Sequence, residues 1–211
     1  MDQDMDDSSS PALRRRIIED ATRLFGEIGY AKTSMRALAG AAGCSKAAVY
    51  YHFGSKETLF CEAVRIQSER HGELIRMDQT TAGSLRERLV VAMKNVFDIA
   101  RAHPQSLLLF YRSILSADAG QPEIDPAHSQ DTLVEFVRVL LQEALDAGEI
   151  WADVDVEDAT RALCGIVDRR CRLLLFEGVP IPDDCPARLA DMFLNGVSSR
   201  PSCHRATRHP H

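Results

Sequence analysis

Residues with hydrogen-bonding side chains stand at the starts of two short helical segments near the N-terminus. Thr33 and Ser34 precede one of these segments, and Ser45 and Lys46 open the next. Free backbone amides at a helix start favour a phosphate oxygen, and a hydroxyl or ammonium group adds another donor. Lys46 is the only long donor at its helix start, and lysine can donate to guanine O6 and N7. These residues indicate anion binding and base reading.

A glycine-containing turn joins the two helices that position these residues. Residues 35–42 predict the first helix, which Gly43 stops, and Ser45 caps a second helix over residues 46–52. In a helix-turn-helix motif, the second helix enters the major groove of DNA, and its first residues reach the base edges. The pattern therefore predicts a helix-turn-helix.

The rest of the periodic sequence is also helical. Apolar residues recur at helical spacing over residues 12–28, and Ser55 caps a fourth helix that runs towards Ile75. No strand pattern competes with these helices, so the sequence predicts an all-α protein. The later helices are expected at residues 85–102, 104–116, 133–145, 156–176 and 186–194, with the last one ended by Gly196.

Charge is distributed unevenly along the chain. The formal net charge is −6, yet residues 12–60 contain eight basic and four acidic side chains and are net +4. Binding to nucleic acid depends on neutralising phosphates, so this basic segment is where we expect it. No apolar run approaches the roughly 18 residues of a membrane span, and none resembles a signal peptide. We therefore expect a cytoplasmic protein with no membrane partner.

Residues 12–60 resemble the TetR family of transcriptional regulators. The similar features are a threonine before the second helix at Thr33, a Tyr-x-His-Phe at residues 50–53 and a Lys-Glu-x-Leu at residues 56–59. The resemblance implies a three-helix helix-turn-helix domain followed by a helical ligand-binding and dimerisation domain. It also implies a homodimer that represses transcription from palindromic, double-stranded operator DNA and is released by a small apolar effector, without a cofactor. We expect the DNA-binding domain at residues 12–60, the second domain at 61–197, and disordered tails at 1–11 and 198–211.

The resemblance also implies which residues contact DNA. Tyr51 and His52 would contact phosphates, although His52 could simply be a surface histidine between two helices, and Tyr50 would face either the groove or the core. Ala48 departs from the family pattern, because Ser or Thr commonly supplies a phosphate contact there, and Cys44 replaces an aliphatic residue. The expected DNA-binding set is Thr33, Ser34, Arg36, Ser45, Lys46, Ala47, Tyr50, Tyr51, His52 and Lys56.

The C-terminal part contains no motif of an enzyme: no phosphate-binding glycine loop, no H-E-x-x-H and no nucleophile elbow. Ligand sites between helices are mostly apolar with a few polar groups, which suggests an effector site, although each apolar candidate could instead be core. Asp168 and Arg172 are four residues apart and could form an ordinary helical ion pair. The candidates are Met93, Phe97, Leu107, Phe110, Tyr111, Phe136, Leu140, Asp168 and Arg172.

Six cysteines show neither paired CxxC motifs nor the density of a disulfide scaffold. Most of them are expected to be small buried hydrophobic residues. The alternative function is a thiol-based redox regulator that uses Cys61, Cys164 or Cys171. Cys203 and the tail histidines match no structural zinc spacing, so no metal site is expected.

Overall fold

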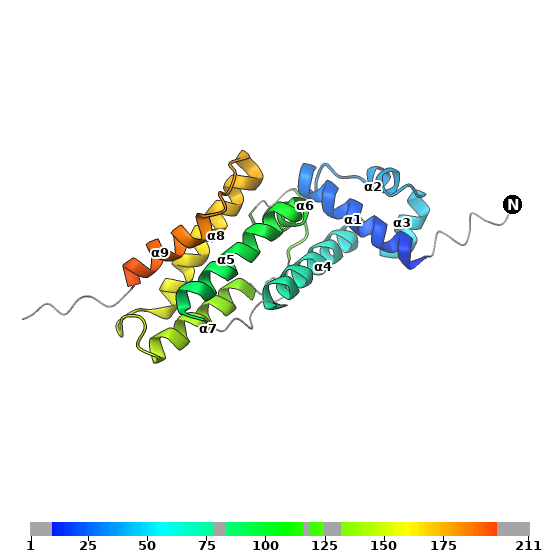
Figure 1. Ribbon diagram of the computed structural model, residues 1–211. Coiled ribbons are helices and arrows are strands. Elements are labelled where there is room, and N and C mark those ends of the chain that lie inside the picture. The colour runs from blue at the N-terminus through cyan, green and yellow to red at the C-terminus, as the bar shows by residue number, and fades with distance from the viewer. Residues whose placement is uncertain (1–9, 78–82, 116–118, 125–131, 198–211) are drawn as a thin grey trace, which may run out of the picture. The chain divides into compact units, whose positions relative to one another are not determined.

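The computed structural model describes residues 10–77, 83–115, 119–124 and 132–197, and every regular element in these ranges is an α-helix (Figure 1). This confirms the all-α fold. The two expected tails lie outside the described residues, except for Ser10 and Pro11. The helices are α1 (Pro11–Ile28), α2 (Met35–Ala41), α3 (Lys46–Phe53), α4 (Lys56–Met77), α5 (Leu85–Ala102), α6 (Pro104–Leu115), α7 (Thr132–Asp146), α8 (Val156–Glu177) and α9 (Cys185–Val197).

The chain divides into two compact units. Unit 1 comprises Met1–Arg76 and Asp98–Asp131, and unit 2 comprises Met77–Phe97 and Thr132–His211. This division differs from the boundary expected after residue 60. The reason is packing: the apolar core around α1 also contains residues of α4 and α6, so these helices belong with the helix-turn-helix.

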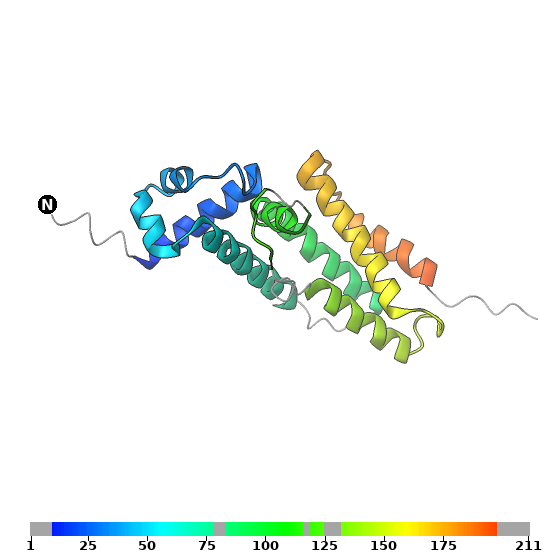
Figure 2. The same cartoon turned by 180° about the vertical axis from the view of Figure 1, so that it is seen from behind.

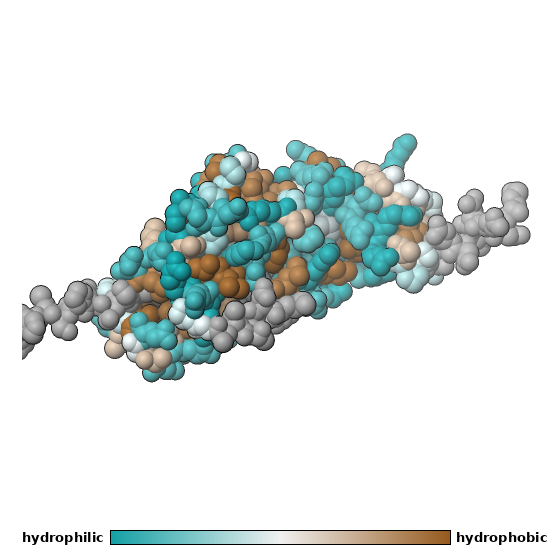
Figure 3. All heavy atoms as spheres, viewed as in Figure 1, coloured by the Kyte–Doolittle hydropathy of each residue, from teal (hydrophilic) through white to brown (hydrophobic). Residues whose placement is uncertain are grey.

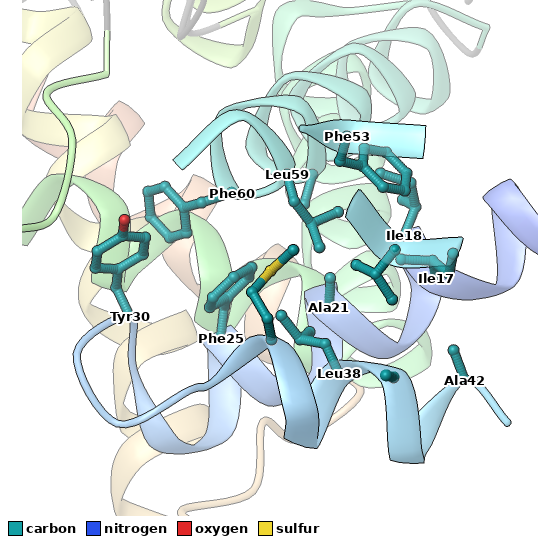
Figure 4. Close-up of a cluster of buried hydrophobic side chains, with 14 of the residues drawn as sticks. Ile17, Ile18, Ala21, Phe25, Tyr30, Leu38, Ala42, Phe53, Leu59 and Phe60 are labelled. Atoms are coloured by element: carbon teal, nitrogen blue, oxygen red, sulfur yellow. The ribbon is translucent and has the colours of Figure 1, made fainter. Parts of the chain in front are cut away.

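The buried face of α1 organises the core of unit 1. Ile17 and Phe25 are completely buried, and Leu38 of α2 and Leu59 of α4 are equally inaccessible. The rings of Phe25 and Phe60 meet edge to face with centroids 5.1 Å apart, a geometry that aromatic pairs prefer. Figure 4 labels this cluster, which includes Ile17, Ile18, Ala21, Phe25, Tyr30, Leu38, Ala42, Phe53, Leu59 and Phe60.

Helix α6 approaches α1 at Gly26. A Cβ atom at this position would lie 2.7 Å from the Gln105 carbonyl oxygen and 3.2 Å from the Leu109 nitrogen. Arg112 donates from Nε to the Gly26 carbonyl (2.7 Å) and from its terminal nitrogen to the Glu27 carbonyl (3.1 Å). These carbonyls end α1 and lack partners within the helix, so α6 both packs against α1 and caps it.

A polar bridge also joins α1, α4 and α6 inside unit 1. Gln67 is buried on α4 and donates from Nε2 to Thr22 Oγ1 on α1 (3.4 Å). Ser106 of α6 donates from Oγ to Gln67 Oε1 (2.8 Å). The Thr22 hydroxyl donates in turn to the Ile18 carbonyl (2.8 Å). Because both ends of the Gln67 amide are bonded, its burial carries little desolvation cost.

In unit 2, the first part of α5 lies beside α7, α8 and α9 in both views (Figures 1 and 2). Arg86 of α5 forms two hydrogen bonds with Asp191 of α9, at 2.6 and 3.0 Å. Arg170 of α8 donates to the Sγ atom of Cys185 at the start of α9. Helix α7 packs against α8. These contacts link α5 to α9, α8 to α9 and α7 to α8.

Most helix ends follow the predicted caps. The hydroxyl oxygen of Ser55 accepts a hydrogen bond from the Thr58 amide (3.0 Å), and Asp155 Oδ1 accepts one from the Asp158 amide (2.9 Å). The expectation for Gly196 was wrong, because α9 continues to Val197. A glycine is only mildly unfavourable in a helix interior, and therefore it does not always end one.

We expect Gly26→Ala to lower the free energy of unfolding by roughly 1–3 kcal/mol, because the new methyl group meets backbone atoms of α6 that cannot rotate away. Gly40→Ala in α2 is the matched control, since no atom lies within 4 Å of a Cβ there. This control should be neutral or stabilising by up to about 1 kcal/mol. Urea unfolding followed by circular dichroism measures both, and equal effects would contradict the close α1–α6 approach.

Candidate nucleic-acid interface

Helices α2 and α3 form a helix-turn-helix with capped starts. The hydroxyl oxygens of Ser34 and Ser45 each accept a hydrogen bond (3.1 Å) from a first-turn amide, those of Ala37 and Ala48. Gly43 in the turn has φ of +62°, a left-handed conformation that favours glycine. The caps and the glycine therefore set where each helix begins and how the chain turns between them.

Two arginines of α1 support this motif from within the protein. Arg16 donates from Nε to the Ala42 carbonyl at the end of α2 (2.8 Å). Arg14 pairs with Glu62 of α4, and its guanidinium carbon lies 5.1 Å from the Phe53 ring centroid. Sequence reasoning missed these contacts, because they join residues far apart in the chain.

Helix α3 has one buried face and one exposed face. Ala48, Val49 and Phe53 are buried in the core of unit 1. The exposed residues are Ser45, Lys46, Ala47, Tyr50 and Tyr51, which we call the reading face.

The position of Tyr50 decides between its two expected environments. Its side chain is 44 % exposed, and that of Tyr51 is 74 % exposed, so neither tyrosine belongs to the core. The ammonium group of Lys46 lies 5.5 Å from the centroid of the Tyr50 ring. The attraction between a cation and an aromatic face favours this arrangement and orients Lys46 at the start of the helix.

Thr33 does not occupy a position from which its side chain can contact DNA. It is only 1 % exposed, and its hydroxyl donates to the Gly29 carbonyl (2.7 Å). The expected phosphate contact from this hydroxyl was therefore wrong. The hydroxyl instead bridges the end of α1 and the segment that leads into α2.

Lys56 also has partners inside the protein. Its ammonium group donates to the carbonyls of Tyr30 (3.0 Å) and Thr33 (3.1 Å) and lies 4.0 Å from the Tyr30 ring centroid. An ammonium group has three N–H donors, so one remains for an anion. Lys56 thus joins the start of α4 to the loop before α2, which the sequence pattern did not reveal.

The other expected DNA-contacting residues lie around the same motif. Ser34 and Arg36 are exposed at the start of α2. His52 is half-buried in α3, and its ring lies 5.3 Å from that of Tyr51. Ala48 is buried, so this departure from the family pattern leaves a core residue in place of a hydroxyl. Cys44 packs against the same core, as expected for a small hydrophobic residue.

The expected effector residues are distributed over both units. In unit 1, Tyr111 is buried, whereas Leu107 and Phe110 are partly buried. In unit 2, Phe136 is partly buried, and three other apolar candidates, Met93, Phe97 and Leu140, are buried. Those three residues therefore belong to the buried core of the protein. Asp168 and Arg172 form the ordinary helical ion pair, with 2.5 Å between Oδ2 and the guanidinium nitrogen.

Three of the described cysteines, Cys44, Cys61 and Cys171, do not resemble reactive thiols. Burial raises the pKa of Cys61, and the nearby Glu57 raises it further. Burial also raises the pKa of Cys44, and Cys171 is buried. Because the thiolate is the reactive form, these environments reduce reactivity. In the described ranges, no cluster of His, Cys, Asp and Glu could hold a metal ion, and no helix there is long and apolar enough to cross a membrane.

Residues 17–63 match the family model of bacterial regulatory proteins of the tetR family. The chain is similar to the HTH-type transcriptional repressor AcnR of Corynebacterium efficiens, with 33 % identity over 147 residues that cover 68 % of this chain and 72 % of that protein. It is also similar to the probable acrEF/envCD operon repressor of Escherichia coli K12, with 28 % identity over 164 residues, or 73 % of this chain and 74 % of that protein.

Solved structures share the fold at lower identity. A putative transcriptional regulator from Saccharomonospora viridis in complex with choline has a TM-score of 0.74 and 20 % identity, covering 90 % of this chain and 100 % of that one. The fatty acid degradation regulator FadR from Bacillus halodurans has a TM-score of 0.72 and 18 % identity, covering 89 % and 97 %. The chain therefore belongs to the tetR family of bacterial regulatory proteins, and it is a DNA-binding transcriptional regulator and not an enzyme.

Proposed function

We propose that the protein is a cytoplasmic repressor that binds a palindromic operator as a homodimer and leaves it when a small apolar effector binds. The observation that carries the proposal is the reading face of α3, where Lys46, Tyr50 and Tyr51 are exposed while the opposite side of the helix is buried. Only a helix with a free face can enter a major groove. Relatives that are named repressors support the direction of regulation.

Within this interface, Lys46 would read a base and the residues around it would bind phosphates. Lys46 is the first residue of α3, and the start of a recognition helix is the part that reaches base edges. Ser34 and Arg36 at the start of α2 and Tyr51 and His52 near the end of α3 would contact phosphates on either side. Ser45 and Ala47 would approach the DNA backbone through their amides.

A homodimer would form through an exposed apolar face of α8 and α9. Phe176 of α8 and Met192 of α9 are 49 % and 57 % exposed, and brown apolar atoms reach the surface in this region of Figure 3. Gly165 and Gly196 lie in these helices, and no atom comes within 4 Å of a Cβ at either position. Glycine weakens a helix, so two of them on open surface suggest that another helix approaches closely.

The palindromic operator follows from the dimer. A single short recognition helix with one long donor makes too few base contacts for tight discrimination, so two reading faces are needed. A two-fold dimer places them on half-sites related by the same symmetry, one helical turn or more apart, or on the order of 34–36 Å.

An apolar effector would act by shifting the population between dimers that fit the operator and dimers that do not. Leu107 and Phe110 in unit 1 and Phe136 in unit 2 are only partly buried and are the apolar candidates still available for contact. The related regulator with bound choline is an example of a small ligand in this fold. The raised pKa of Cys61 and the burial of Cys171 argue against these two cysteines as the thiol of the redox alternative.

Lys46→Ala and Lys56→Met should differ in kind. Lys46→Ala should cost roughly 1–3 kcal/mol in operator affinity and relax preference at one base position in each half-site, with the fold unchanged. Lys56→Met should lower the free energy of unfolding by about 1.5–3 kcal/mol, because it removes hydrogen bonds from a charged donor. Fluorescence anisotropy on operators varied one base at a time, together with urea unfolding, separates the two effects. A uniform loss across all sequences for Lys46→Ala would mean that Lys46 touches only phosphate.

Gly165→Leu should weaken the dimer by about 1–3 kcal/mol, or roughly 10- to 100-fold in its dissociation constant, while each protomer stays folded. The side chain has open space in one protomer and would meet the partner helix in the dimer. Gln142→Leu is the control, because it places the same leucine side chain at an exposed position of α7 and not on α8 or α9. Sedimentation equilibrium gives the dissociation constants. An unchanged dimer in Gly165→Leu would place the interface on another surface.

A further inference from the structure

Helix α4 carries two buried polar atoms that have no hydrogen-bond partner in the described part of the chain. Among the described residues, no hydrogen-bond partner lies within reach of Ser68 Oγ or His71 Nε2, although both atoms are inaccessible to solvent. The neighbouring Gln67 has both ends of its amide bonded to Thr22 and Ser106. A buried polar group without a partner lowers stability, so two of them one helical turn apart require an explanation.

The electrostatic surroundings of His71 are positive. Burial, together with the nearby His103 and Arg70, lowers its pKa to about 4, and no carboxylate contributes. His71 is therefore a neutral imidazole near pH 7, beside groups that favour negative charge. In the tautomer that carries its proton on Nε2, His71 can donate to an acceptor, and the positive charge of Arg70 favours an anionic one.

Apolar side chains lie one turn beyond these polar groups. Leu74 follows His71 on α4 and is 36 % exposed. Leu107 follows His103 by one turn of α6 and is partly buried; its amide donates to the His103 carbonyl at 3.3 Å. A molecule that bonds to Ser68 and His71 would therefore meet apolar side chains next to its polar end.

We infer that Ser68 and His71 bind the carboxylate of a small amphiphilic acid, with the Ser68 hydroxyl and the His71 ring as donors and His103 close by. This inference rests on the proposed release by an effector and refines it, because the effector becomes a monocarboxylate with an apolar chain. The two polar atoms that are unpaired in the free protein gain their partners in the complex. Binding also favours the imidazolium form of His71, so it is coupled to uptake of a proton.

The test compares octanoate with octan-1-ol, which has the same chain length but no charge, on the full-length protein by calorimetric titration at pH 6.5. Hydrogen bonds to a charged group should make octanoate bind at least about tenfold more tightly than the alcohol. The preference should fall to near one in Ser68→Ala and His71→Gln. Titrations in phosphate and bis-Tris buffers, which differ in ionisation enthalpy, should show proton uptake by the wild type but not by His71→Gln.

Ser106→Ala is the matched control, because its hydroxyl has a partner in Gln67 and takes no part in the site. It should lower the melting temperature of the free protein and keep the preference for octanoate. Ser68→Ala should leave that temperature unchanged or raise it, since the hydroxyl has no partner to lose. Three results would overturn the inference. The wild type could bind octanoate and octan-1-ol equally, or it could bind no straight-chain acid from acetate to decanoate. Both site variants could also keep the preference for octanoate.

Operator release separates this inference from the proposed function. If octanoate binds with the expected preference but the operator stays bound, the carboxylate site holds and release by an effector fails. If uncharged apolar compounds release the operator equally from the wild type and His71→Gln, while octanoate shows no preference, release by an effector holds and the carboxylate site fails. Fluorescence anisotropy of a labelled operator measures its release, and the calorimetric titrations measure the preference for octanoate.

Discussion

The burial of one face of α1 is the constraint on which unit 1 depends. Ile17 and Phe25 are completely buried, and the residues that cover them come from α2, α3, α4 and α6. Helices α2 and α3 are too short to be stable alone, since helices below about 12 residues are marginal in water. They persist because their apolar residues pack against α1, which leaves the outer face of α3 exposed.

Local signals in the sequence were sufficient to predict where most helices begin. Ser45 and Ser55 accept hydrogen bonds from first-turn amides as their positions predicted, because a cap involves residues only three apart. Local signals also predicted the exposed Lys46 but left Tyr50 undecided. That side chain could have packed inward or outward with the same spacing, and only the tertiary arrangement places it 44 % exposed.

Contacts over long sequence separations explain what could not be predicted. Thr33 and Lys56 have residue types suited to phosphate binding, yet the Thr33 hydroxyl and the Lys56 ammonium group donate to backbone carbonyls inside unit 1. A donor at a helix start satisfies a phosphate or a carbonyl equally well, so its partner depends on what the fold brings near. The division of the chain into two units also depends on contacts between residues far apart in the sequence, because α6 joins unit 1 through Gly26 and Arg112.

Ser68 and His71 lie on α4 and His103 immediately precedes α6, and these two helices also hold α1. Gln67 precedes Ser68 and bonds to Thr22 of α1, while Arg112 of α6 caps the end of α1. A ligand that draws α4 and α6 together or apart must therefore change the support of the helix on which α3 packs. Coupling between two sites is reciprocal, so DNA that fixes α3 in one position would change affinity at α4 by the same factor. Both sites lie within unit 1, so this coupling requires no change in unit 2.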